Sequence, residues 1–195
     1  MTLSPASSRA LLDLARQAIR AALTDRLPPA PPDSTELAQR AGCFVSLHEM
    51  TTHALRGCVG QLQSDQPLAQ LVPRVAESCL RDPRFGHHRV TLHELPELQI
   101  EITLLSPLRA AASPLDFDLL NEGIVLRVDE IEGCFLPQVA RETGWSKEQL
   151  LDRLCSEKLG LPANAWRGPD ARLSAFTTLL IGPEPFEPRL GQPHG

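Results

Sequence analysis

Several features that would identify a class of protein are missing from this chain of 195 residues. No apolar run approaches the roughly 20 residues that a membrane-spanning helix needs. The formal net charge of −5 excludes a general basic face for non-specific nucleic-acid binding. The N-terminus lacks the basic and apolar regions of a secretory signal, and the sequence has no internal repeat or phosphate-loop pattern. We therefore expect a cytoplasmic protein without a membrane association.

The five cysteines form no Cys-x-x-Cys pair, and their number is odd. In a reducing compartment such scattered cysteines remain thiols, so neither a structural zinc site nor any other metal or cofactor is predicted. Four of them are expected to be small buried residues in apolar surroundings without a charged partner: Cys43, Cys79, Cys134 and Cys155. The fifth, Cys58, lies in a different context.

Hydrophobic periodicity predicts helices and strands in an order without regular βαβ alternation. The predicted strands are 43–47, 54–60, 98–105, a hairpin over 124–135 and a last strand over 173–181. This order favours an α+β fold with a mixed or antiparallel sheet and flanking helices. We expect one domain over 1–182 with two subdomains, a main one (1–136 with 170–182) and a small helical one (137–169). Residues 183–195 are expected to be a proline-rich tail.

The most informative stretch is the hexapeptide LRGCVG at 55–60. Glycine has no side chain to pack, so Gly57 and Gly60 around a cysteine indicate a close backbone approach or a bulge. If this strand pairs with 43–47, Arg56 and Cys58 share one face, and the guanidinium favours the thiolate. Two interpretations stay open. Cys58 is an activated nucleophile or a pocket thiol beside Arg56, or it is a small buried residue while Arg56 pairs with a carboxylate.

Other residues could complete a site around Cys58. His48 would share its face but lie roughly 13 Å away along the ladder, too far for a dyad. Arg84 belongs to a local basic run that would either bind phosphate or carboxylate or be a solvated loop. Glu101 lies on the polar face of its strand, as a general base or as the ion-pair partner of Arg56 or Arg84.

Together with the hexapeptide, an ordered set of segments resembles the AMMECR domain family. These segments are FVSL at 44–47, DPRF at 82–85, IEITLLS at 100–106, LPQV at 136–139, GW at 144–145, and GLP at 160–162 with Trp166. The resemblance implies an α+β fold of two unequal subdomains, with the cysteine motif near the cleft between them. It also implies an association with Memo-like proteins and a radical SAM partner. One departure is LNEG at 120–123, where family members commonly carry a lysine, so a role of that lysine is absent here or filled differently.

Two functional hypotheses follow. The first is an enzyme or enzyme component that acts on a small anionic or nucleotide-like substrate. Its site residues would be Cys58 and Glu101 as catalytic groups and Arg56, Gly57, Gly60 and Arg84 as substrate-binding groups. The second is a non-catalytic binding module or scaffold for a Memo-like or radical SAM partner, with the motif surface as the interface.

Overall fold

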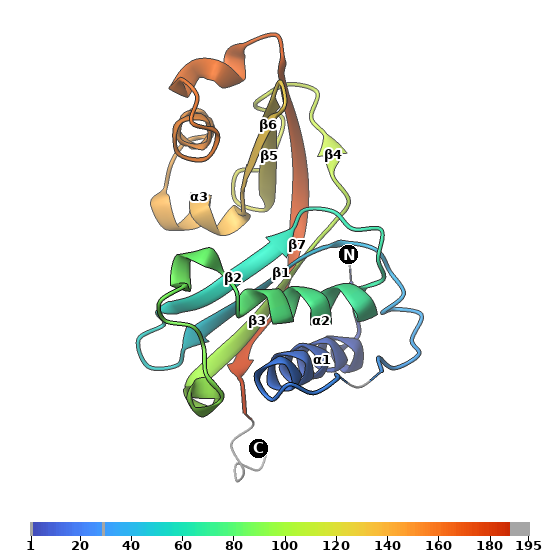
Figure 1. Ribbon diagram of the computed structural model, residues 1–195. Helices are drawn as coiled ribbons and strands as arrows, with labels where there is room; N and C mark the ends of the chain where they lie inside the picture. The colour runs from blue at the N-terminus through green and yellow to red at the C-terminus, as the bar shows by residue number, and fades with distance from the viewer. Residues whose placement is uncertain (1, 29, 188–195) are drawn as a thin grey trace. The chain divides into compact units, whose positions relative to one another are not determined.

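The computed structural model describes residues 2–28 and 30–187, which fall into two compact units. The larger unit comprises Thr2–Leu105 and the chain from Leu179 onward, and the smaller unit is Ser106–Thr178. Each unit combines antiparallel strands with helices (Figure 1), so the fold is α+β as predicted. Within the described residues, every helix is too short or too polar to cross a membrane.

The larger unit is built on three complete strands, two helices and the last residues of the final strand. Its elements are α1 (Pro5–Leu23), β1 (Gly42–Glu49), β2 (Leu55–Gln61), α2 (Leu68–Cys79) and β3 (Leu98–Leu105). The short 3-10 turns η1 (Pro83–Phe85) and η2 (Leu92–Glu97) lie between α2 and β3. β1 pairs antiparallel with β2 on one side and with β3 on the other, which makes β2 the edge strand. The sequence correctly predicted this hairpin and the strand 98–105.

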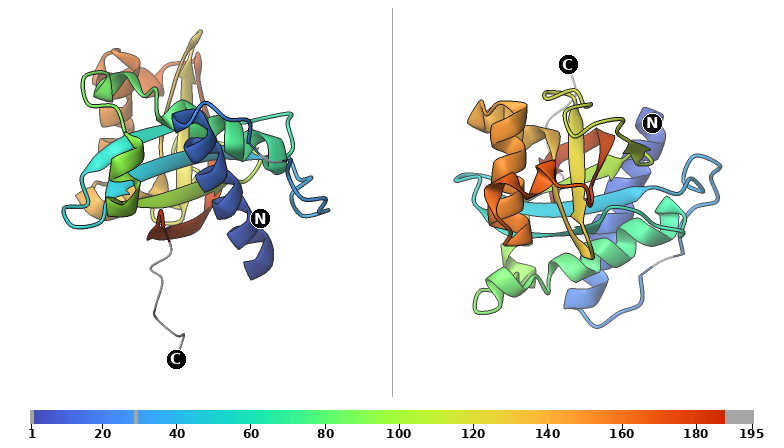
Figure 2. Two further views of the ribbon diagram at one scale, coloured as in Figure 1. Left: turned by 60° about the horizontal axis from the view of Figure 1, so that its bottom comes forward. Right: turned by 90° about the horizontal axis from the view of Figure 1, so that it is seen from above.

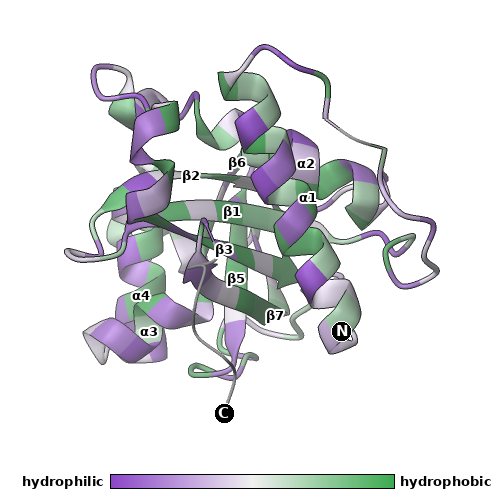
Figure 3. Ribbon diagram, turned by 90° about the horizontal axis from the view of Figure 1, so that it is seen from below, coloured by the Kyte–Doolittle hydropathy of each residue, from purple (hydrophilic) through white to green (hydrophobic). Residues whose placement is uncertain are grey.

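Helices α1 and α2 lie side by side against one face of these strands (Figure 2). α1 starts at an N-cap where the Ser4 hydroxyl accepts a hydrogen bond from the Ser7 N–H, with proline at the first helical position. Hydrophobic and hydrophilic residues alternate around both helices (Figure 3), as expected for helices with one buried side. Pro73 lies inside α2 rather than at its start.

The face of the strands that meets the helices forms the apolar core of the larger unit. Val45, Leu47, Ile100 and Ile102 on this face are completely buried. Because strand side chains alternate, the residues between them point to the opposite face, away from α1 and α2. We call this opposite face of β1, β2 and β3 the polar face.

The smaller unit consists of short helices on a second group of strands. Its elements are β4 (Arg109–Ala110), β5 (Glu122–Val128), β6 (Ile131–Phe135), α3 (Pro137–Thr143), α4 (Lys147–Arg153), the π-helical turn η3 (Leu154–Leu159), the 3-10 turn η4 (Ala163–Arg167) and the first part of β7 (Ala171–Pro185). α3 ends at Gly144 with a φ of 67°, and α4 starts with a capping box formed by Ser146 and Gln149.

The chain divides at different positions from those expected. We placed the hairpin 124–135 with the main subdomain, but it packs with the helices that follow it. Its buried side chains Ile124, Leu126 and Phe135 share one hydrophobic cluster with Leu151 and other helical residues. Burial of these apolar side chains against the helices groups β5 and β6 with the smaller unit.

The expected tail starts later than residue 183. β7 continues to Pro185, and the next residue, Phe186, is only 1% exposed. The Phe186 N–H donates a hydrogen bond of 2.7 Å to the carbonyl of Leu98. An aromatic ring that is buried and anchored in this way belongs to the core of the larger unit. Residues 188–195 of the expected tail lie outside the described residues.

Candidate functional site

Three polar side chains form a row across the polar face. Ser46 on β1 lies directly opposite Cys58 on β2 and directly opposite Glu101 on β3. Residues opposite each other in antiparallel strands point to the same face. Adjacent strands are about 4.8 Å apart, so the Cα atoms of Cys58 and Glu101 are about 10 Å apart with Ser46 between them. The sequence analysis identified Cys58 and Glu101 but missed Ser46. A prediction that β1 pairs with β3 would have placed Ser46 between them.

The backbone of Cys58 is held from the open edge of β2. Its N–H donates a hydrogen bond of 2.9 Å to Oδ2 of Asp82, and its carbonyl accepts one of 3.0 Å from Nη2 of Arg84. The same Nη2 lies 2.7 Å from Oδ2 of Asp82. The ion pair thus occupies the hydrogen-bonding groups that a further strand would use, which protects this edge. The sequence analysis named Arg84 as a candidate site residue, whereas it named Asp82 only within the segment DPRF.

Asp82 is an ionised carboxylate in a buried position. Its pKa is lowered to about 2, chiefly by hydrogen bonds from the Arg84 side chain; burial acts in the opposite direction, and the Cys58 N–H adds to the lowering. Asp82 is only 4% exposed, whereas 58% of the Arg84 side chain is exposed. The charge of Arg84 is therefore largely compensated, although the guanidinium still reaches solvent.

Arg56 has a carboxylate partner, which was one of the two interpretations left open. Its Nη1 lies 2.5 Å from Oε1 of Glu94 and 3.6 Å from Oε1 of Glu49. Its Nη2 donates a hydrogen bond of 3.1 Å to the carbonyl of His88. With 16% of its side chain exposed, Arg56 fixes the segment between α2 and β3 to the start of β2.

Glu101 pairs with neither arginine, contrary to one of the two alternatives. The carboxylate partners of Arg56 and Arg84 are Glu94 and Asp82. Glu101 is half-buried, and this burial raises the pKa of its carboxyl, while the nearby His48 lowers it. Among the described residues its carboxylate forms no ion pair or hydrogen bond. Glu101 therefore holds a proton more strongly than an exposed glutamate does.

Both glycines of the motif are approached closely, as predicted, by atoms of the protein itself. A Cβ atom at Gly57 would lie 2.6 Å from the carbonyl oxygen of Cys79 at the end of α2. A Cβ atom at Gly60 would overlap the ring of Phe44 on β1. The glycines thus allow α2 and Phe44 to pack directly against β2 on either side of Cys58.

The cysteines differ in burial. Burial raises the pKa of the Cys43 and Cys79 thiols to about 12, and Cys155 is also buried. Cys134 on β6 was expected to be buried without a charged partner, but it is only half-buried, and the charges of Lys158 and Glu132 act on its thiol, whose pKa burial raises. Cys58 is half-buried as well. Cys58 and Cys134 are therefore the cysteines that the structure leaves partly exposed.

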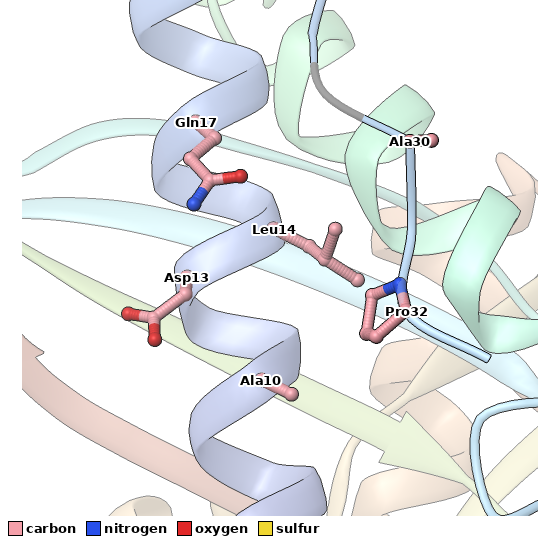
Figure 4. Close-up of a pocket in the computed structure, with 6 residues that line it drawn as sticks. All are labelled: Ala10, Asp13, Leu14, Gln17, Ala30 and Pro32. Carbon is pink, nitrogen blue, oxygen red and sulfur yellow. The ribbon is translucent and has the colours of Figure 1, made fainter. Parts of the chain in front are cut away.

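A separate hollow lies beside α1. It has a volume of about 320 Å³ and is lined by Ala10, Asp13, Leu14, Gln17, Ala30 and Pro32. In Figure 4 the Leu14 side chain points toward Pro32, whereas the Asp13 carboxylate points away from it. This hollow offers few convergent polar groups. In the part of the chain that the structure describes, no group of three or more His, Cys, Asp or Glu side chains is arranged to hold a metal ion.

Comparison with known proteins identifies relatives along almost the whole chain. A protein from Methanothermobacter thermautotrophicus is 34% identical over 190 residues, which cover 92% of this chain and 95% of the relative. A protein from Thermococcus gammatolerans is 32% identical over 185 residues, with 89% of each chain covered. The crystal structure of the uncharacterized protein PH0010 from Pyrococcus horikoshii matches with a TM-score of 0.78 and 31% identity, covering 87% of this chain and 88% of that chain. The model of the AMMECR1 family matches residues 12–181, and the chain therefore belongs to the AMMECR1 family.

Proposed function

We propose that this protein is an enzyme or enzyme component that binds a small anionic or nucleotide-like molecule on the polar face. The row of Cys58, Ser46 and Glu101 supports this proposal most strongly. It combines a partly exposed thiol, a hydroxyl and a carboxyl whose pKa is raised by burial. A nucleophile and a group with a perturbed pKa on one surface are typical of sites that transfer a group or a proton.

The geometry suggests a different role for each residue. Cys58 is the nucleophile, and Glu101, about 10 Å away, is too far to take the thiol proton directly. Glu101 instead orients the ligand or exchanges a proton with it, and Ser46 contributes a hydrogen bond between them. Gly57 and Gly60 act through the backbone, because their close packing fixes the position of the strand that carries Cys58.

The two arginines contribute unequally to anion binding. Nη1 of Arg84 has no hydrogen-bond partner among the described residues, and the side chain is more than half exposed. This nitrogen is available to an anionic group of the ligand. Arg56 is held by Glu94 and by the carbonyl of His88, so its role is to position the loop rather than to bind the anion.

A thermal-shift panel of nucleotides, sugar phosphates and small carboxylates tests the proposal. A true ligand raises the melting temperature and slows the alkylation of Cys58 by iodoacetamide. The Arg84→Ala variant should lose this protection, whereas Arg81→Ala should keep it, because Arg81 is exposed and, among the described residues, its side chain pairs with Glu77 alone. The proposal fails if every compound that stabilises the protein leaves Cys58 alkylation unchanged, or if both arginine variants behave alike.

A second candidate is a non-catalytic module that binds a Memo-like or radical SAM protein. The pairing of both arginines with carboxylates of the same chain supports it, because compensated charges suit a polar interface rim better than an anion pocket. A pull-down of such partners with the wild type, Arg56→Ala and Arg84→Ala tests this candidate. Equal recovery with all three proteins argues against the motif as the interface.

A further inference from the structure

His48 lies closer to Cys58 than the sequence indicated. The expected distance of roughly 13 Å came from pairing His48 with Ala54. In the structure Ser46 pairs with Cys58, and the register of β1 with β2 shifts between Leu47 and His48. His48 is therefore two residues from the partner of Cys58, which places the Cα atoms of His48 and Cys58 about 8 Å apart.

The irregularity belongs to β2 and leaves His48 on the polar face. β1 keeps a regular register with β3 through both residues, with Ser46 opposite Glu101 and His48 opposite Gln99. Residues two apart in a regular strand point to the same side. The imidazole of His48 thus shares its face with the row of Cys58, Ser46 and Glu101.

The hydrogen bond of the His48 ring determines which nitrogen carries the proton. Its Nδ1 lies 3.3 Å from the carbonyl oxygen of His53, and a carbonyl oxygen can only accept. Nδ1 is therefore the donor, and in the neutral imidazole the free lone pair is on Nε2. Among the described residues Nε2 has no hydrogen-bond partner.

The turn that supplies this carbonyl is itself held in place. His53 has a φ of 58°, and its N–H donates a hydrogen bond of 3.0 Å to the carbonyl of Glu49. Its ring Nδ1 lies 3.2 Å from Nε2 of the Gln99 side chain. A carbonyl fixed in this way holds the His48 ring in one orientation.

We infer that His48 is the proton acceptor of the site, taking the proton of the Cys58 thiol on Nε2 either directly or through the hydroxyl of Ser46. The inference rests on the proposed role of Cys58 as the nucleophile. The S–H bond breaks as the N–H bond forms, and the electron pair stays on sulfur. When Ser46 takes part, its hydroxyl releases one proton to Nε2 and receives the thiol proton. The products are a thiolate and an imidazolium, without oxidation or a co-reactant.

The charges beside His48 are compatible with this transfer. The strand pairing and the turn place these titratable and charged groups near it: Glu49 on β1, Arg56 and Cys58 on β2, Glu101 on β3 and His53 in the turn. Arg56 has its charge compensated by Glu94, so it adds little repulsion to an imidazolium. Glu101 interacts with His48 through its charge, and this interaction lowers the pKa of the Glu101 carboxyl.

The test is the alkylation rate of Cys58 by iodoacetamide between pH 5 and 10, measured by mass spectrometry on the full chain. Cys134→Ser serves as the background, because Cys134 is the other accessible thiol. An ordinary thiol is only a few per cent ionised at pH 7, so loss of the base should slow the reaction about tenfold. His48→Asn should show this loss at pH 7 and approach the wild-type rate at pH 10, where the thiol ionises unaided. Asparagine can still donate a hydrogen bond to the His53 carbonyl, and His93→Asn, on an exposed histidine, is the matched control.

The outcomes separate the inference from the proposed function. If the wild type reacts faster than a small-molecule thiol but His48→Asn reacts equally fast, the role of His48 is wrong and the nucleophile stands. If the wild type reacts no faster than a small-molecule thiol at any pH, the nucleophile itself is refuted. Nitrogen-15 NMR of the wild type gives an independent result: a His48 ring protonated on Nδ1 is expected, either neutral or as the imidazolium that forms together with the thiolate. A neutral ring whose only proton is on Nε2 overturns the inference.

Discussion

Replacement of Asp82 by asparagine should lower the free energy of unfolding by about 2 kcal/mol at pH 7. Asp82 is buried, and its pKa falls from an ordinary value of 3.8 to about 2 in the folded protein. At about 1.4 kcal/mol for each pH unit, this difference corresponds to about 2.5 kcal/mol. We reduce it to about 2 kcal/mol because the partner, Arg84, is exposed and solvent screens its charge. Asparagine also keeps one oxygen that can accept from the Cys58 N–H.

The same ion pair predicts how this difference depends on pH. The pKa of Asp82 is lower in the folded than in the unfolded chain, so the stabilisation is complete above about pH 4 and is lost as the pH falls toward 2. About half should remain at pH 3. Urea unfolding followed by circular dichroism at pH 7, 4 and 3 measures this, with the exposed Asp65→Asn as control. Equal stability of wild type and Asp82→Asn at pH 7, or a difference that grows with acidity, would refute the reasoning.

Three further predictions concern packing and thiol accessibility. Gly57→Ala should lower the free energy of unfolding by about 1–3 kcal/mol, because its Cβ would lie 2.6 Å from a carbonyl oxygen. Gly86→Ala, the control, should change the free energy of unfolding by less than about 0.5 kcal/mol. Urea unfolding of the two variants measures the difference. A chain ending at Gly182 should melt at a lower temperature than the full chain. Phe186→Ala should lower the free energy of unfolding by about 3–5 kcal/mol, because that ring is buried. An unchanged melting temperature would show that this segment is not part of the core. Cys79, with a pKa raised to about 12, should react with a disulfide reagent at pH 8 only after unfolding, and rapid native labelling would contradict its burial.

Local sequence signals predicted most elements correctly. The alternation in 98–105 reflects one buried side, and this strand formed as expected. The apolar residues of α1 after Pro5 likewise reflect one buried side. The capping box at Ser146 and the glycine at 144 likewise act within a few residues. These features could be predicted because their causes lie within one turn or one strand.

The errors come from interactions between distant segments. The expected boundary at 136 placed β5 and β6 in the main subdomain. In the structure Ile124 and Leu126 pack with apolar side chains of the helices that follow, and the local sequence pattern does not show this contact. The start of the tail was predicted too early because prolines at 183 and 185 suggested that the strand had ended. In the structure β7 continues to Pro185, and the next side chain, Phe186, is buried. A proline shows where the backbone lacks an N–H donor and has a fixed φ. It does not show whether a neighbouring aromatic ring is buried and holds the end of the strand in place.

The candidate site shows the same limit. The hexapeptide identified Cys58, and alternation placed Arg56 near it, but neither predicted which carboxylates would pair with the arginines. Glu94 reaches Arg56 from 38 residues further along the chain. Asp82 pairs with Arg84 only two residues away, but it also accepts from the Cys58 N–H, which is 24 residues earlier. The row through Ser46 also depends on the pairing of β1 with β3, which no residue in either strand specifies alone.

The most direct test of the polar face as a functional site is the native alkylation rate of Cys58. The rate is measured at pH 7 by mass spectrometry, relative to Cys134 in the same molecules and to a small-molecule thiol. An activated nucleophile should react about tenfold faster than both, under conditions where the protein stays folded. A Cys58 that reacts no faster than Cys134, or only as fast as the protein unfolds, would show that the motif serves packing alone.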